Sequence, residues 1–121
     1  MAKVNVKTHN KLVRDGIPKK IRDNGEVAVV RKLSEFEKRH YLLVKLGEES
    51  KEALETQDFK RSLLELVDIV EAVDEYLRVH GISWKEFRAV QAEKRRLVGG
   101  FKGGTFLEET YRLTTKKGGR R

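Results

Sequence analysis

The stretch from Leu63 to Val79, LLELVDIVEAVDEYLRV, constrains the fold of this chain more than any other. At about 100° per residue, its apolar residues define a wide core face of a helix. That face comprises Leu66, Ile69, Val70, Val73, Tyr76 and Leu77. Further apolar residues, Leu64, Val67 and Ala72, fall on the other half, between acidic residues. Because a helix with apolar residues on both halves is largely buried, we expect its acidic residues to lie at an interface rather than in open water.

Helix start and stop signals recur along the rest of the chain. Pro18 fits the first turn of a helix, with Asp15 as a cap before it and Gly25 as its end. The further signals are two capping boxes, an N-cap aspartate and a C-terminal glycine, namely Ser34 with Glu37, Ser83 with Glu86, Asp58, and Gly81. Residues 27–33, VAVVRKL, are short and β-branched, which predicts an extended segment or short strand lying on the helices. We therefore predict an all-α fold, a bundle of about four helices.

Composition limits the class of protein. With 121 residues we expect one domain, over residues 1–110, followed by a basic, disordered tail at 111–121. The absence of cysteine excludes disulfides, thiolate metal sites and cysteine nucleophiles, and a single proline favours long helices. Neither a secretory signal nor an apolar run long enough to span a membrane is visible, so we expect a cytoplasmic protein.

The net charge of +8 is concentrated at one end. After Thr110 the chain holds five lysine and arginine residues and no acidic residue, which leaves +3 for the remainder. The tail therefore predicts at most weak binding to a nucleic acid or another polyanion. The overall charge says little about what the domain itself does.

Two acidic pairs stand at helical spacing, Glu49 with Glu52 and Glu65 with Asp68, and Glu48 lies one turn before Glu52. Within each pair the Cβ atoms are roughly 5–6 Å apart on one helix face. Two like charges at about 6 Å cost about 3 kcal/mol at an effective dielectric constant near 20. If the two helices pack antiparallel, these carboxylates require a counter-charge, and oxygen ligands suit Mg²⁺ or Mn²⁺. The alternative is an ordinary solvated acidic face.

Basic residues lie near both ends of the chain, and those near the start offer one possible contact for a phosphate. Lys11 and Arg14 precede the first predicted helix, where positive side chains and backbone donors can meet an anion. A local ion pair and a cap explain Arg14 and Asp15 equally well. Residues 94–96, KRR, close the last predicted helix, where cations also complement the helix dipole.

The loop at residues 98–109, VGGFKGGTFLEE, contains four glycines that allow backbone N–H groups to approach a ligand. It does not match the P-loop pattern, and glycine-rich turns are common without a ligand. Phe101 is interpreted either as a packing plug or as a base-stacking residue, and the plug is favoured.

Three stretches together are similar to one known family: NKLVRDGIP at the start, EExxE at 48–52 followed by ExxD at 65–68, and EKRRLVGGFKGGTFLEE near the end. They span Asn10 to Glu109. This ordered combination resembles the MazG-like superfamily of all-α nucleoside triphosphate pyrophosphohydrolases. The superfamily includes dimeric dUTPases and phosphoribosyl-ATP pyrophosphohydrolase. The start resembles that of a branch of small, stand-alone members with a KLVRDxIP motif, although Gly16 replaces a larger, charged residue that is frequent there.

The resemblance implies a helical bundle that assembles into dimers or tetramers and binds Mg²⁺, with Mn²⁺ as a possible substitute. It implies hydrolysis of a nucleoside triphosphate to a monophosphate and pyrophosphate, as in the clearance of modified or surplus nucleotides. The metal ligands carried over are Glu49, Glu52, Glu65 and Asp68. Glu48 would be a further ligand or would orient the attacking water, so that Glu48 and Glu49 are the candidate catalytic residues. The candidate phosphate-binding residues are Lys11, Arg14, Lys94, Arg95 and Arg96.

Two other classes of protein stay open. A small basic nucleic-acid-binding module would bind DNA or RNA with a steep dependence on salt and no need for a metal. An inactive helical interaction protein would oligomerise but release no pyrophosphate from any nucleotide.

Overall fold

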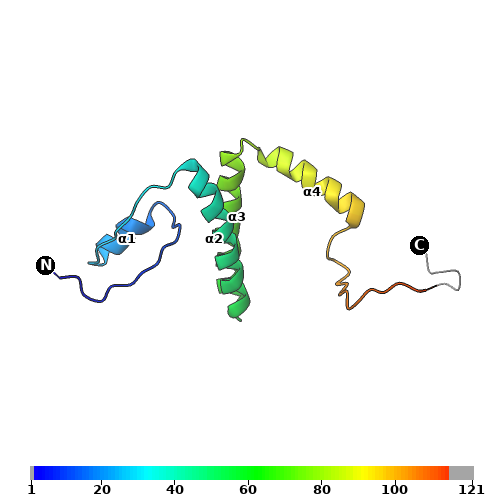
Figure 1. Cartoon of the computed structure of the whole chain (residues 1–121), viewed down its shortest axis with the longest axis horizontal. Coiled ribbons are helices and arrows are strands. Elements are labelled where there is room, and N and C mark those ends of the chain that lie inside the picture. The colour runs from blue at the N-terminus through cyan, green and yellow to red at the C-terminus, as the bar shows by residue number, and fades with distance from the viewer. Residues whose placement is uncertain (1, 115–121) are drawn as a thin grey trace. The chain divides into compact units, whose positions relative to one another are not determined.

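Four α-helices and no strand make up the regular structure of residues 2–114, which are the residues described by the computed structural model. The helices are α1 (Ile17–Asp23), α2 (Glu35–Glu55), α3 (Phe59–Val79) and α4 (Trp84–Val98), labelled in Figure 1. The predicted all-α fold class is therefore confirmed. The predicted tail falls mostly on residues 115–121, which lie outside the described residues.

Residues 27–33 form neither a helix nor a strand. Val27, Val29 and Val30 are exposed, so this segment does not lie on the helices as predicted. Short β-branched runs favour a strand only where a partner strand or an apolar surface is available. In the described part of the chain, neither is present for these valines.

The chain divides into two compact units, residues 1–87 and residues 88–121. The first unit holds α1, α2, α3 and the beginning of α4, and the second unit holds the rest of α4 and the residues that follow. The single domain over residues 1–110 stays a prediction.

Helices α2 and α3 form an antiparallel hairpin, because only residues 56–58 separate two helices that lie side by side (Figure 1). The buried apolar side chains of the described residues are Leu42 on α2 and Ala72 and Leu77 on α3. An ion pair also joins the helices, with 2.8 Å between Lys38 Nζ and Glu75 Oε2. This hairpin positions the acidic residues discussed below.

Local hydrogen bonds set the ends of these helices largely where the sequence predicts them. At the start of α2, the Ser34 hydroxyl accepts the Glu37 N–H at 3.1 Å, and the Glu37 carboxylate accepts the Ser34 N–H at 3.2 Å. This is the predicted capping box. Asp58 accepts the Lys60 N–H at 3.0 Å and caps α3. Ser83 and Glu86 make the second predicted box, before α4.

The cap of α1 differs from the prediction. Its N-cap residue is Gly16, and no side chain makes a capping hydrogen bond, so the role given to Asp15 is wrong. Pro18 does lie in the first turn. Gly25 follows the helix with φ of +85°, a left-handed conformation that glycine adopts at low cost.

Much of the apolar surface of α3 is exposed in the single chain. Leu63, Leu66, Val67 and Val70, spaced i, i+3, i+4 and i+7, are between 47% and 54% exposed. The expectation that this helix is largely buried is therefore wrong for one chain. The physical reason is that α2 covers one side of α3, and no other described residue of the first unit covers this stripe.

In the described residues, no helix has the length and apolar character needed to cross a membrane.

Candidate metal centre

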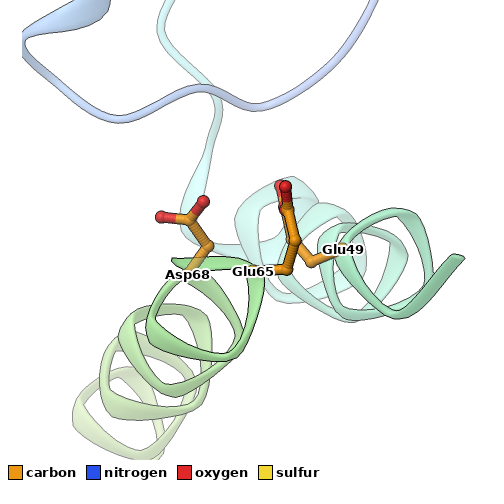
Figure 2. A group of neighbouring side chains, drawn as sticks. All are labelled: Glu49, Glu65 and Asp68. Carbon is orange, nitrogen blue, oxygen red and sulfur yellow. The ribbon is translucent and has the colours of Figure 1, made fainter. Parts of the chain in front are cut away.

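Three carboxylates from two helices meet on one side of the hairpin. Glu49 comes from α2, and Glu65 and Asp68 come from successive turns of α3. One carboxylate oxygen from each lies within 4.8 Å of the others. Figure 2 shows the three side chains pointing to the same side of the helix pair. The antiparallel packing thus brings together residues from both predicted acidic pairs.

Glu49 is the buried member of this cluster. It is 5% exposed, and its Oε1 atom lies 3.2 Å from Lys45 Nζ, one turn earlier on α2. Burial by itself raises the pKa of Glu49. Hydrogen bonding with Glu65 and the nearby Lys45 ammonium outweigh burial and lower that pKa below its ordinary value. Glu49 therefore ionises more readily than an isolated glutamate.

Glu65 has the opposite shift. Hydrogen bonding with Glu49 raises the pKa of Glu65 to about 7, with further contributions from burial and from Glu52. Two neighbouring carboxyl groups repel each other when both are ionised, so the second one keeps its proton to a higher pH than an isolated glutamate does. A divalent cation relieves the same repulsion and can take the place of that proton.

Asp68 is neutralised from outside the hairpin. The Arg14 guanidinium donates a hydrogen bond to Asp68 Oδ1, with 2.6 Å between the nitrogen and the oxygen. A second guanidinium nitrogen lies 4.0 Å from Glu71 Oε1. Arg14 and Asp68 are 54 residues apart in the sequence, so this ion pair fixes the N-terminal segment on α3.

The other predicted acidic residues lie at the margin of the cluster. Glu52 hydrogen-bonds with Glu65 and with Glu49 but does not join the three oxygens within 4.8 Å. Glu48 is partly exposed and also lies outside that group. All these donors are carboxylate oxygens, which is the donor set that Mg²⁺ and Mn²⁺ prefer. The residues therefore fit a hard divalent cation.

The predicted phosphate-binding residues are divided between the two units of the chain. Arg14 reaches the acidic cluster, but as the partner of Asp68 rather than of Asp15. Lys11 makes no ion pair with any residue between positions 2 and 114. Lys94, Arg95 and Arg96 belong to the second unit, where Arg96 pairs with Glu93 at 2.6 Å. Their role toward phosphate stays a prediction.

Two basic residues near the cluster were not among the site residues predicted from the sequence. Lys45 pairs with Glu49, and Arg61 lines a hollow beside the α2–α3 turn. The available signal was spacing, because Lys45 precedes Glu49 by four residues and Arg61 precedes Glu65 by four. Helix surfaces often carry such pairs without a site, so spacing alone did not separate these two residues from other basic residues.

The glycine-rich loop gives no evidence for a plug. Phe101 is 99% exposed in the described part of the chain, so the favoured interpretation of it as a packing plug is wrong. Gly99 and Gly104 have φ values of +81° and +61°, and the loop turns at these positions.

No protein-family model, no curated protein and no solved structure matches this chain. The resemblance to the MazG-like superfamily therefore depends on the motifs alone, and membership stays a prediction.

Proposed function

We propose that this protein is a Mg²⁺-dependent nucleoside triphosphate pyrophosphohydrolase of the MazG-like type. The observation that carries the proposal is the convergence of Glu49, Glu65 and Asp68 from two antiparallel helices. Acidic residues on one exposed helix face do not by themselves require a cation. A buried glutamate, Glu49, with carboxylate oxygens of Glu65 and Asp68 within 4.8 Å provides a stronger reason for a cation to bind.

The proposed ligands are Glu49, Glu52, Glu65 and Asp68. A divalent cation bound there would neutralise charge on the triphosphate and make the phosphorus more electrophilic. Glu48, partly exposed beside the ligands, is proposed to orient the attacking water and accept its proton. The water oxygen forms a new bond to phosphorus while the bond between the α and β phosphates breaks, and pyrophosphate leaves with the electron pair.

We also propose that the chain works as a homo-oligomer, a dimer or a tetramer. The exposed stripe on α3, Leu63, Leu66, Val67 and Val70, supports this proposal. The stripe has the i, i+3, i+4, i+7 spacing with which one helix packs on another. A second copy presents the same stripe, so a two-fold axis would pair like with like. Cytoplasmic location stays a prediction.

The decisive experiment measures pyrophosphate release from a panel of ordinary and modified nucleoside triphosphates, with Mg²⁺ and with EDTA. We expect Mg²⁺-dependent release, with the matching monophosphate as the second product. Glu49→Gln and Asp68→Asn should abolish release while the helical content measured by circular dichroism stays near normal.

Glu35→Gln is the matched control, because Glu35 is an exposed carboxylate on α2, the helix that carries Glu49, and its ion pair is with Lys38, outside the proposed site. Turnover that survives in both Glu49→Gln and Asp68→Asn contradicts the metal-site assignment. Absence of turnover, with no effect of Mg²⁺ on the melting temperature, would favour a nucleic-acid-binding module. Normal oligomers without turnover would favour the inactive interaction protein.

A further inference from the structure

A hollow of about 610 Å³ lies beside the acidic cluster, where α2 turns into α3. Two of the proposed metal ligands, Glu52 and Glu65, form part of its wall. The wall is completed by Glu55, Thr56, Gln57, Arg61 and Leu64. A substrate that meets a cation held by Glu52 and Glu65 would therefore extend into this hollow.

Arg61 is the basic residue of this wall, and its guanidinium is unengaged. Over residues 2–114, Arg61 forms no ion pair and no side-chain hydrogen bond, whereas Arg14 pairs with Asp68 and Lys45 pairs with Glu49. Arg61 stands four residues before Glu65 on α3, so the two side chains lie on the same helix face. The basic side chain available to contact an incoming anion is therefore Arg61, because Arg14 and Lys45 already pair with carboxylates of the cluster.

The charge of the hollow decides when an anion can enter. Its wall has three carboxyl groups against one guanidinium, so its formal charge is −2 when Glu65 is ionised and −1 when Glu65 is protonated. This charge repels a phosphate chain in the absence of metal. A divalent cation held by the proposed ligands, of which Glu52 and Glu65 belong to this wall, reduces the negative charge and leaves Arg61 facing the chain. We therefore expect a phosphate chain to bind in the hollow only after a divalent cation has bound.

We propose that Arg61 binds a phosphate group of the nucleoside triphosphate in this hollow, and that it does so only when a divalent cation is present. This inference rests on the proposed function. A guanidinium presents two parallel N–H groups to a phosphate, which an ammonium does not. The Thr56 hydroxyl and the Gln57 amide supply further hydrogen-bonding groups in the same wall. Arg61 is therefore a substrate-binding residue, separate from the metal ligands.

The test uses inorganic tripolyphosphate, which carries the phosphate chain without a base, so that the unknown base preference does not matter. Its binding to the full chain is measured by titration calorimetry, with Mg²⁺ and with EDTA. The variants are Arg61→Gln, Arg61→Lys and the control Lys60→Gln, which removes the same charge from the neighbouring residue outside the hollow. Binding of Mg²⁺ alone is measured for each protein.

We expect Arg61→Gln to weaken binding of tripolyphosphate in Mg²⁺ by about tenfold, as for a lost charge-assisted hydrogen bond. Arg61→Lys should fall in between, Lys60→Gln should stay near wild type, and binding of Mg²⁺ alone should not weaken in any of them. Undiminished tripolyphosphate binding in Arg61→Gln, with clear Mg²⁺-dependent binding in the wild type, overturns this inference and leaves the proposed function standing. Weaker binding of Mg²⁺ alone in Arg61→Gln also overturns it. A wild-type protein that binds neither Mg²⁺ nor tripolyphosphate overturns both.

Discussion

At the scale of single residues, the chemistry of this protein depends on how three carboxylates are neutralised. Glu49 pairs with Lys45 and Asp68 pairs with Arg14, while the pKa of Glu65 is raised to about 7, so that Glu65 keeps its proton to a higher pH than usual. In each case a basic side chain or a proton reduces the repulsion among the three carboxyl groups. A divalent cation would have to replace the proton and compete with Arg14, so both should control its affinity.

The proton on Glu65 predicts a pH dependence of stability without divalent cations. Its pKa in the folded protein is about 7, above the ordinary value of 4.5, so the folded state binds more protons between these values. The stabilisation is full below pH 4.5 and is lost as the pH rises through 7. We expect the melting temperature in EDTA to fall between pH 5 and pH 8, and Glu65→Gln to flatten this dependence.

Because the pKa of Glu49 is lowered on folding, its contribution to the stability changes below pH 4.5 and not between pH 5 and pH 8. A wild-type melting temperature that rises from pH 5 to pH 8, by the same amount in Glu65→Gln, would show that the two glutamates do not share a proton.

Arg14 is expected to weaken the binding of a divalent cation at the acidic cluster. Arg14→Gln removes a positive charge 2.6 Å from Asp68, so we expect Mg²⁺ to bind several-fold more tightly at low ionic strength. Titration calorimetry without nucleotide measures this change. Lys19→Gln is the control, because Lys19 forms its ion pair with Asp23 on its own helix. Weaker Mg²⁺ binding in Arg14→Gln would mean that Arg14 positions the ligands instead of competing with the cation.

At the scale of elements, polar side chains connect α2 to α3 in addition to the small apolar contact. Glu75 on α3 accepts hydrogen bonds from Arg78, with donor–acceptor distances of 2.6 Å and 2.7 Å, and from Lys38 on α2, at 2.8 Å. These contacts, with that to Arg78 the strongest, lower the pKa of Glu75 to about 2. Where the beginning of α2 meets the end of α3, the hairpin is thus held by an ion-pair network as well as by Leu42 and Leu77.

The stabilisation from this ion-pair network should be lost at low pH. Because the pKa of Glu75 is lowered on folding, its stabilisation is present above pH 4.5 and is lost as the pH falls toward 2. We expect Glu75→Gln to lower the free energy of unfolding by about 1 kcal/mol at pH 7. The gap to wild type should close near pH 2, as measured by urea denaturation. Asp23→Asn, which breaks an ion pair within α1, is the control. A gap that persists at pH 2 would indicate lost packing rather than lost charge.

At the scale of the whole molecule, the apolar stripe on α3 is the largest unexplained feature of the single chain. Few side chains of the described residues are fully buried, while Leu63, Leu66, Val67 and Val70 stay about half exposed. A stable homodimer buries about 1,200–2,000 Å² or more of total surface, and one helix stripe from each chain forms the centre of such an interface.

Polar substitution on this stripe should therefore dissociate the oligomer. We expect Leu66→Gln with Val70→Gln to shift the protein to monomers and to lower its melting temperature, as measured by sedimentation and circular dichroism. Val27→Gln with Val29→Gln is the control, since these valines are exposed outside the helices. A wild-type protein that stays monomeric at high concentration would contradict the proposed assembly.

The helix boundaries followed from the sequence because capping is local. Ser34, Asp58 and Ser83 hydrogen-bond within three residues along the chain, so neighbouring residue types suffice to predict them. The acidic pairs were visible for the same reason, since i,i+3 spacing on a helix fixes which residues share a face. Asp15 was misassigned because Gly16 takes the cap position, and backbone conformation rather than side-chain type decided this end.

Only the tertiary structure decided which faces meet. The pairing of Arg14 with Asp68, the burial of Glu49 and the exposure of Leu66 depend on contacts between segments far apart in the sequence. Periodicity shows that a helix face is apolar or acidic, but it does not show whether α2, a second chain or water covers that face. The acidic cluster required α2 and α3 to pack antiparallel in one register, which brings the Glu49 turn against the turns of Glu65 and Asp68. Local residue types do not encode that register, because it depends on how whole helix surfaces pack together.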